Sequence, residues 1–541
     1  MKFRGSSALS GVIPSNYKTA AILKKWENGG ILWDKELSGP FSIICIDKMI
    51  GTAEIVTDML SFIPVYSASL GIVSNGLVFG THVDTVAEVA KDKSDLDQIS
   101  LVDFIINKTV SYPYTLYQGV RQVTPASVTL VENGIADRAK EMNYWTPVEE
   151  NTFSSIDDAT YAVRCALRTS VLDICEDVND VGVLLSGGED SRAVLAAIPD
   201  GIKKTGYLFI DSYNREARTA KRIADIYGSD FMVGYRSPTH YLDQIQECIR
   251  LVGLQNEFTH VHAYGFHKKF RFEKHDAILG GLKSDTFLKG YYIPLWQFNA
   301  TGSRIFSAKF KRYLGNRKSV IRHLKEEIFK IENRVIFSCD LLENVAERQL
   351  RHLHRVAKFR HSTLAEWIKI WPISQDQEIN NFNGHRRLFR NCEPFLSSDI
   401  VKLAASVPPE WKIGRRLFQR ATKPLLRRSW FVPHAGEGHF PYFSGKPNIA
   451  LRFFCTKYRE IYRKSHPSKH YNQGPWPDWD AVVKTKQMDN LIEEHEAYYG
   501  SLKAIFNNLP FSNLFNKTSL DSATKLRILQ VAIGVKSASV I

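Results

Sequence analysis

The chain has 541 residues, of which 44% are hydrophobic, which is enough for two or three well-packed domains. No apolar run approaches the ~18 residues of a membrane span, and the N-terminus lacks the order of a secretion signal, so we expect a cytoplasmic protein that does not enter a membrane. The formal net charge of +14 leaves room for an anionic partner.

The first 150 residues contain short apolar runs separated by turn residues, as in antiparallel sheets. These runs are GPFSIICID from Gly39, PVYS from Pro64, LVFGT from Leu77 and the NYW that ends at Trp145. Together they resemble the later part of an N-terminal-nucleophile glutaminase domain. The resemblance implies a truncated, mostly antiparallel α+β domain over residues 1–150, and a second domain over 151–541.

The chemistry of that glutaminase family is missing from the sequence. Such an enzyme needs Cys directly after the initiator Met, so that the terminal amine can act as base for the thiol. Residue 2 is Lys2, the first cysteine is Cys45, and GVIPSN from Gly11 to Asn16 is at best a remnant of the glutamine-binding segments. We therefore expect no hydrolysis of glutamine, and an amine supplied as free ammonia, by the substrate itself, or by a separate glutaminase.

A helix is predicted over Thr152 to Asn179. Ser155 and Asp158 have capping-box spacing, and Ala159, Ala162, Val163 and Ala166 fall on one helical face.

The most informative segment follows, VGVLLSGGEDSRAVL from Val181 to Leu195. An apolar strand runs into a Ser- and Gly-rich turn, and a helix opens after it, which together favour a phosphate chain through backbone N–H groups, hydroxyls and the helix dipole. Asp190 beside phosphates indicates a Mg²⁺ ligand. The segment lacks the Gly-Lys-Ser/Thr of the Walker pattern.

SGGEDS resembles the SGGxDS pyrophosphate loop of the ATP pyrophosphatases, which split ATP between the α and β phosphates to form an adenylate. The resemblance implies an ATP site at Ser186, Gly187, Gly188, Asp190 and Ser191.

Three further stretches resemble, in order, the synthetase domain of the asparagine synthetases. In the first, Tyr207 to Ile210, the family holds adenosine partly through backbone groups, which points to Leu208. The second, Ile278 to Gly290, resembles a glycine-containing loop in which Gly281 lies near the nucleotide and Asp285 falls on a residue that holds Mg²⁺ and pyrophosphate. This chain departs from the family at Lys283, Ser284 and Thr286.

The third stretch is Glu393-Pro394-Phe395-Leu396 with VPPEWK from Val407, which resembles E-x-R-x-PFLD and LPPExK. Ser397 stands where the family has Asp. The family then carries a Lys that stabilises charge when the amine attacks, and here the best alignment offers Arg416, with Lys412 as second candidate. Arginine at this place would act electrostatically, since it stays charged at any working pH; Lys412 could equally be a solvated residue near a helix end.

The alternation of strands and helices from 180 to about 300 predicts a doubly wound parallel sheet, an adenine nucleotide hydrolase-like α/β fold, with the Ser186 and Asp285 loops converging at its carboxyl edge. From 300 to 541 we expect mainly helices. The basic stretch from Ser303 to His361 is read as amphipathic helices; its basic faces are either solvated or a platform for RNA, an acidic polysaccharide or a peptide. Lys464 to Trp479 is predicted to be a loop.

The histidine groups at His260–His267 and His434–His439 lack partners with zinc-site spacing, so we assign no metal there. Pro433 to Tyr442 is a Gly-containing loop that could cover the acceptor side. The 7 scattered cysteines predict reduced thiols.

The leading hypothesis is an ATP-dependent, AMP-forming carbon–nitrogen ligase with ATP and Mg²⁺, acting on a small-molecule or peptide carboxylate and on ammonia or an amine. β-Lactam synthetases and lasso-peptide cyclases share this plan and also lack a working glutaminase half. Two alternatives stay open: an RNA-modifying pyrophosphate-loop enzyme, to which the N-terminal remnant is an objection, and a non-catalytic relative, suggested by Thr286, Ser397 and the missing Lys.

Overall fold

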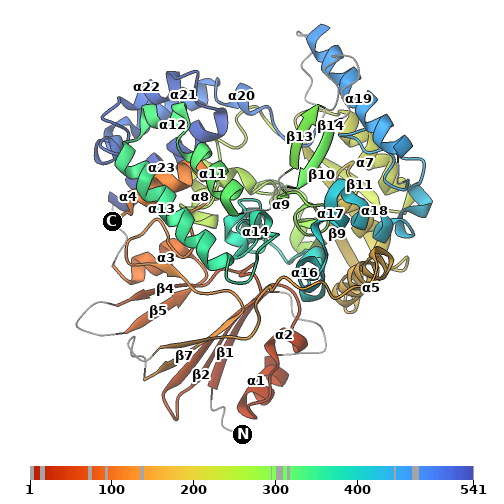
Figure 1. Cartoon of the computed structure of the whole chain (residues 1–541), viewed down its shortest axis with the longest axis horizontal. Coiled ribbons are helices and arrows are strands. Elements are labelled where there is room, and N and C mark those ends of the chain that lie inside the picture. Colours follow the sequence, from red (N-terminus) through yellow and green to blue (C-terminus); the bar gives the residue numbers. More distant parts are fainter. Residues whose placement is uncertain are drawn as a thin grey trace.

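The computed structural model of the chain describes residues 5–11, 19–70, 76–91, 95–133, 139–293, 295–299, 309–313, 317–443, 446–465 and 474–539. Lys2 and most of Gly11–Asn16 lie outside these ranges. In Figure 1 the antiparallel N-terminal strands lie on one side of the molecule, and the parallel sheet with its helices lies on the other. Among the described residues, no helix is both long enough and apolar enough to cross a membrane.

Two antiparallel sheets build the N-terminal part, with the orders β1-β2-β3-β7-β8 and β5-β4-β6. The strands are β1 Gly5–Gly11, β2 Phe41–Asp47, β3 Thr52–Thr57, β4 Tyr66–Ser69, β5 Leu77–Gly80, β6 Arg121–Gln122, β7 Ser127–Glu132 and β8 Lys140–Asn143. The helices of this part are α1 Thr19–Glu27, α2 Trp33–Glu36, α3 Val83–Val89 and α4 Gln98–Asn107.

These elements stack as helix, sheet, sheet and helix. Ile55 of β3 and Val131 of β7 pack against Val65 and Val123 between the two sheets. Helices α1 and α2 cover the outer face of the larger sheet, and α3 and α4 cover the smaller one. The predicted α+β domain is confirmed, with two sheets instead of one layer.

A five-stranded parallel sheet forms the second part, in the order β11-β10-β9-β12-β15. Its strands are β9 Asp180–Leu184, β10 Lys203–Ile210, β11 Asp230–Tyr235, β12 Ala277–Leu279 and β15 Asn391–Cys392. From β9 the chain first adds strands on one side and then, with β12, on the other. This reversal makes the sheet doubly wound, as predicted, and places a crevice between the carboxyl ends of β9 and β12.

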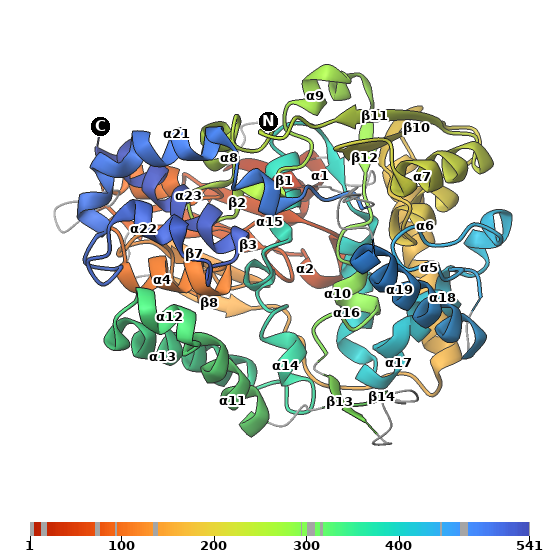
Figure 2. The ribbon, with the colours of Figure 1, turned by 90° about the horizontal axis from the view of Figure 1, so that it is seen from above.

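Side-chain alternation along β10 explains why both faces of the sheet are covered. Leu208 and Ile210 belong to the core under the crossover helices, whereas Tyr207 and Phe209 point to the opposite face and join Phe266. The crossover helices are α6 Asp190–Ala197 and α7 Arg215–Ile226, and Figure 2 shows both beside β10. Helix α5, Ile156–Cys175, precedes the sheet and packs in the same core.

The predicted lead-in helix is confirmed as α5. The Ser155 hydroxyl accepts the backbone N–H of Asp158 at 3.1 Å, which caps the first turn. Ala159, Val163 and Ala166 are buried along one face, as the spacing predicts.

The rest of the chain is mainly helical. Its α-helices are α8 Ile245–Val252, α9 Phe266–Lys269, α10 Ser284–Leu288, α11 Arg317–Ile328, α12 Ile331–Ile336, α13 Cys339–Val356, α14 Leu364–Trp367, α15 Ile379–His385, α16 Ser398–Ser406, α17 Pro409–Lys412, α18 Arg416–Thr422, α19 Lys446–Ser465, α20 Trp479–Val482, α21 Lys486–His495, α22 Phe511–Asn516 and α23 Ser522–Ser539. Its 3₁₀ turns are η2 Phe258–His260, η3 Phe272–Lys274, η4 Ile373–Gln375, η5 Pro394–Leu396, η6 Ile413–Arg415, η7 Leu425–Ser429 and η8 Glu496–Leu502.

The helical interpretation of the basic stretch from Ser303 to His361 is wrong at its start. Lys309–Tyr313 forms strand β14, which pairs antiparallel with β13 (Leu295–Asn299). The segment KFKRY has its aromatic residues three positions apart and no strict alternation, so its pattern does not separate a strand from a helix. Helices α11 to α13 follow it. The predicted loop from Lys464 to Trp479 lies partly outside the described residues, and its described part, 474–478, is neither helix nor strand.

A second hydrophobic core joins the C-terminal helices to the N-terminal part. Leu529 and Ile533 of α23 share this core with Leu101 and Phe104 of α4. The side chain of Arg527 ties the contact together, because its Nε donates to the Ile105 carbonyl and its NH1 lies 2.7 Å from the Glu257 carboxylate.

Replacing Arg527 with Met is expected to lower the free energy of unfolding by about 3–5 kcal/mol, because it removes the guanidinium from the buried Glu257 carboxylate and leaves only His260 beside it. Urea denaturation of the full chain measures this. Lys503→Met, at an exposed lysine beside the same core, is the control and is expected to change little. Equal effects of the two substitutions would contradict the structural role of the Arg527–Glu257 pair.

Candidate functional site

The candidate site lies in the crevice between β9 and β12. The loop after β9 leads into α6, and the loop after β12 leads into α10. The two loops touch at Gly281, where an added Cβ would lie 2.8 Å from the backbone N of Ser191 and 2.9 Å from the Asp190 Cβ. Only glycine, which has no Cβ, allows this close approach. The predicted loops at Ser186 and Asp285 therefore lie side by side, as expected at the carboxyl edge of a doubly wound sheet.

Hydrogen bonds within the phosphate-loop candidate hold its shape. The Ser191 hydroxyl accepts the N–H of Ser186 at 3.0 Å, and the two hydroxyl oxygens lie 3.1 Å apart. The Gly188 N–H donates to the Ser186 hydroxyl, and the Gly187 N–H donates to the carboxylate of Glu216 at 2.7 Å. The donors offered to a phosphate are therefore chiefly the two hydroxyls and the first turn of α6, and less the glycine N–H groups that the sequence suggests.

Leu208 lies in β10, close to the phosphate loop. The ladder between β10 and β9 ends at Tyr207 and Leu184, so Leu208 is the first residue beyond it. Its side chain is buried in the core, so only its backbone is left for the predicted contact with adenosine.

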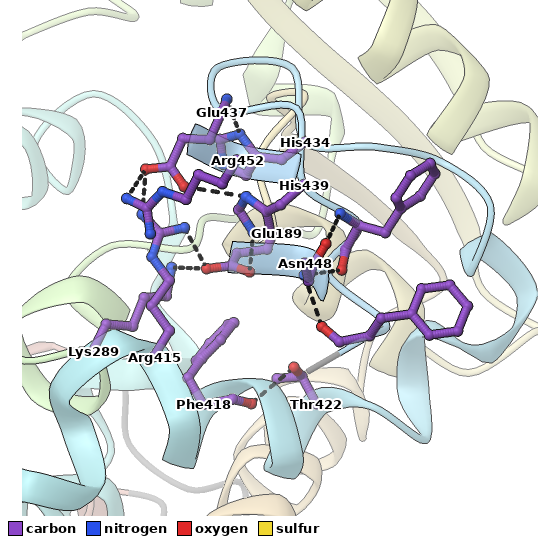
Figure 3. A network of polar contacts seen from close by, with 12 residues as sticks. Glu189, Lys289, Arg415, Phe418, Thr422, His434, Glu437, His439, Asn448 and Arg452 are labelled. Carbon is purple, nitrogen blue, oxygen red and sulfur yellow. Dashed lines mark hydrogen bonds and ion pairs between the residues drawn. The ribbon is translucent and has the colours of Figure 1, made fainter. Parts of the chain in front are cut away.

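A cluster of charges fills the crevice behind the loop, as Figure 3 shows in part. Glu189, in the middle of SGGEDS, is 1% exposed. The ammonium of Lys289, which follows α10, lies 3.1 Å from carboxylate oxygens of both Glu189 and Asp285, and it forms an ion pair with Asp190. Burial alone would lower the pKa of Lys289, but the three carboxylates outweigh burial and raise it.

Arg415 connects this cluster to a further carboxylate, that of Glu437. Its guanidinium lies 2.8 Å from both Glu189 and Glu437. His439 also lies between these two carboxylates, 3.5 Å from Glu189 and 3.2 Å from Glu437, and they raise its pKa against the effect of burial. Arg452 of α19 pairs with Glu437 at 2.7 Å.

The segment from Pro433 to Tyr442 covers the phosphate loop. The Ala435 N–H donates to the Gly187 carbonyl at 3.0 Å. The fully buried Arg192 of α6 donates to the carbonyls of Val432 and Pro433. The sequence predicts that this segment covers the side where the amine would enter. In the structure it lies directly against SGGEDS.

Within this segment, His434 offers a neutral donor to the loop. Its Nδ1 accepts the N–H groups of Gly436 and Glu437 at 3.0 and 3.1 Å, so its Nε2 carries the proton when the ring is neutral. Burial lowers its pKa to about 3, which makes the neutral form dominant near pH 7. Nε2 lies 3.6 Å from the position that a Cβ on Gly188 would occupy, so the N–H faces the loop.

A Mg²⁺ ion held by Asp190 and Asp285 was predicted, and the residues as they lie do not fit it. The two carboxylates converge on one point, but the Lys289 ammonium takes that point. Among the described residues there is no group of three or more His, Cys, Asp or Glu that could hold a metal.

The two predicted catalytic residues do not meet in the crevice. Arg416 is exposed at the first position of α18, and Arg415, in a left-handed conformation with φ of 66°, reaches the carboxylates in its place. Lys412, the second catalytic candidate, is 1% exposed and pairs with Glu366 at 2.8 Å, so the alternative of a solvated residue is wrong. Burial lowers the pKa of Lys412, and Glu366 opposes this shift.

The departures from the asparagine synthetase pattern have structural roles. Lys283 has a φ of 71° and is buried against Asp376 at 2.6 Å, and the Thr286 hydroxyl donates to the same carboxylate. Ser397 caps α16 by accepting the Ile400 N–H, a role that Asp would also perform.

Glu393 supplies a third segment to the crevice, from the end of β15. Its carboxylate accepts the Leu282 N–H at 2.9 Å and occupies the space above Gly280, where a Cβ would meet it at 2.3 Å. Burial raises its pKa to about 7, and the Leu282 N–H opposes this shift.

Sequence reasoning missed five residues that converge in the crevice, namely Glu189, Lys289, Arg415, Glu437 and His439. One signal was available: a glutamate in the middle of a buried, glycine-rich loop requires a cation nearby. The sequence does not say which of many basic residues provides it.

Two family comparisons agree with this geometry. The sequence model of the asparagine synthase family matches residues 162–430, and that of a glutamine amidotransferase domain matches residues 10–145. The chain therefore belongs to the asparagine synthetase-like family, with an N-terminal domain of glutamine amidotransferase type. Members of this class are ATP-dependent amidotransferases or ligases.

Comparisons with individual proteins are weaker. No curated protein sequence matches the chain. Among solved structures, a glutamine phosphoribosylpyrophosphate amidotransferase from B. subtilis, complexed with ADP and GMP, is 11% identical, with 42% of this chain and 45% of that chain covered and a TM-score of 0.16. An allosteric regulatory enzyme of purine biosynthesis is also 11% identical, with 43% and 61% covered and a TM-score of 0.17. The chain spans less than two thirds of the length of either.

Gly281→Ala is expected to weaken ATP binding by about tenfold, because the new Cβ would push the two loops apart. Isothermal titration calorimetry with ATP measures the change. Gly201→Ala is the matched control, since no atom lies within 4 Å of the Cβ that it adds. Unchanged affinity in Gly281→Ala would show that the nucleotide does not need the two loops in contact.

Glu393 also predicts a pH dependence of stability. Its pKa is higher in the folded chain than in the unfolded chain, so the folded state binds the extra proton and loses stability as pH rises towards 7. Between pH 5 and pH 8 the free energy of unfolding is expected to fall by about 3 kcal/mol more in the wild type than in Glu393→Gln, which cannot ionise. An equal change in the free energy of unfolding of the two proteins between pH 5 and pH 8 would contradict this.

Proposed function

We propose that the protein is an ATP-dependent ligase that activates a carboxylate as its acyl-adenylate and then joins the acyl group to ammonia or to an amine. The observation that carries the proposal is the convergence of the Ser186–Ser191 loop, the start of α6 and the Gly281 loop in the crevice of a doubly wound sheet. A phosphate chain fits hydroxyl donors and a helix start in this arrangement.

In the first step, a carboxylate oxygen of the substrate forms a bond to the α-phosphorus of ATP, and the bond from that phosphorus to the bridging oxygen breaks. Pyrophosphate leaves with the electron pair. The hydroxyls of Ser186 and Ser191 and the first-turn N–H groups of α6 hold the phosphates. Lys289 and Arg415 are the positive charges nearest to the leaving group, and they offset its charge.

In the second step, the amine nitrogen forms a bond to the acyl carbon, AMP leaves with the electron pair of the C–O bond, and the nitrogen releases a proton. The N–H of His434 faces the loop and provides a neutral hydrogen-bond donor on this side.

We propose ammonia or an amine as the nitrogen source, because the N-terminal part offers no activated thiol among its described residues. The first cysteine, Cys45, lies in β2 with no exposed surface, and burial raises its pKa to about 12. A thiol of this kind stays protonated near pH 7 and is a poor nucleophile.

The direct test is the fate of the carboxylate oxygen. Purified protein is incubated with ATP and an ¹⁸O-labelled acid, first aspartate with ammonia and then acids fractionated from a cell extract. An acyl-adenylate mechanism transfers one ¹⁸O to AMP and releases pyrophosphate. Transfer of label to inorganic phosphate would instead indicate an acyl-phosphate and would overturn the proposal.

Two variants control for contaminating ATPases. The double substitution Ser186→Ala and Ser191→Ala is expected to lower pyrophosphate release at least about tenfold, as the loss of two hydrogen bonds to phosphate predicts. Ser154→Ala, at an exposed serine before α5, is expected to retain the wild-type rate. Glutamine is expected not to replace ammonia as nitrogen source; if it does, an intrinsic glutaminase is present.

A further inference from the structure

Lys289 is the residue in the crevice whose position the family resemblance does not explain. Its side chain is 3% exposed, and its ammonium lies among the carboxylates of Glu189, Asp190 and Asp285. Asp190 and Asp285 are the residues that the sequence predicts as metal ligands. The ammonium thus stands between two carboxylates at the point where a bridging metal ion would need to be.

Two neighbouring elements hold Lys289 in place. Its backbone continues α10, whose Phe287 and Leu288 are completely buried, so the residue cannot shift without moving that helix. Its Nζ also lies 4.3 Å from the centre of the Phe418 ring, at a distance typical of cation–π contacts. Withdrawing the ammonium would break both this contact and three ion pairs.

We propose that the Lys289 ammonium replaces a protein-bound metal ion at Asp190 and Asp285, so that this chain binds nucleotide phosphates through a fixed cation. The inference deepens the proposed function, because it concerns how the same crevice holds ATP. A metal ion that bridges the two carboxylates would have to displace a buried ammonium from its partners, and breaking such a pair is costly.

Among the described residues, this point also offers a small divalent ion few free ligands besides the waters and phosphate oxygens that such an ion commonly keeps. Mg²⁺ requires near-octahedral oxygen ligands at 2.0–2.1 Å. Here the carboxylates of Asp190 and Asp285 both face the ammonium of Lys289. The third carboxylate near this point, that of Glu189, pairs with Lys289 and also with Arg415.

The test uses Mn²⁺ as a paramagnetic probe, and electron paramagnetic resonance of the full-length protein without substrate reports the bound fraction. The wild type is expected to show no stoichiometric Mn²⁺ site. Lys289→Met leaves Asp190 and Asp285 without their cation and is expected to bind Mn²⁺ at least about tenfold more tightly. Adding Asp285→Asn to Lys289→Met is expected to abolish that gain.

Two control variants separate the site from general effects of charge and folding. Lys203→Met removes an exposed lysine that also pairs with an aspartate, Asp180, and is expected to behave as the wild type. Lys289→Arg retains the cation and is also expected to bind no Mn²⁺. Thermal unfolding of each variant shows whether it folds.

A second measurement keeps the proposal testable if Lys289→Met does not fold. Binding of α,β-methylene-ATP to the wild type is measured by calorimetry with Mg²⁺ and with excess EDTA. The expected change in affinity is less than about threefold, because Lys289 is present under both conditions.

The inference is overturned if the wild type binds one Mn²⁺ as tightly as Lys289→Met, or if EDTA abolishes binding of the analogue. If the protein binds no nucleotide with or without Mg²⁺ but shows the expected Mn²⁺ pattern, the proposed function is refuted. The replacement of a metal ion by Lys289 would still hold.

Discussion

The buried carboxylate of Glu189 is the interaction on which the organisation of the crevice depends. A charge with 1% exposure inside a glycine-rich loop is stable only if cations surround it. Lys289, Arg415 and His439 provide them, and they come from three separate segments of the chain. One buried charge thereby fixes the phosphate loop, the end of α10, the start of α18 and the segment that covers the loop.

Sheet topology determines where these segments can meet. Because strand order reverses between β9 and β12, the loops that follow these two neighbouring strands meet at their carboxyl ends, where a doubly wound sheet has its crevice. Gly281 lets the second loop touch the first, and Gly280 makes room for Glu393 from the end of β15. The glycines are thus required by close packing between loops.

Local patterns in the sequence were sufficient for the parts of the fold that depend on neighbours in the chain. The strand, the SGGEDS turn, the start of α6 and the Ser155 cap of α5 were predicted because each rests on contacts within a few residues. Strand β14 was missed because a helical interpretation was extended over Lys309–Tyr313, whose short pattern does not exclude either a helix or a strand. Basic and apolar residues are interleaved in both patterns, so composition alone did not separate them.

Contacts between distant segments set the limit of prediction in the crevice. Arg416 was expected there and Arg415 is found there, because Gly414 and Arg415 both adopt left-handed backbone conformations and redirect the side chains that follow. No propensity rule identifies such a pair in advance. Lys289 was overlooked for a related reason: next to α10 it resembles any basic residue after a helix, and only the fold reveals the carboxylates around it.

The balance of charge in the crevice explains how the folded chain tolerates so many ionised groups. Four carboxylates lie in the connected cluster, and four basic groups, including His439 with its raised pKa, pair with them. The carboxylates are those of Glu189, Asp190, Asp285 and Glu437, and the basic groups are those of Lys289, Arg415, His439 and Arg452. Without Lys289, Asp190 and Asp285 would lose the cation that pairs with both, and Arg415 would remain as a more distant positive charge. With Lys289 in place, Asp190 and Asp285 have a cation beside them before any ligand enters, and a metal ion added at the same point would bring two further positive charges next to the ammonium.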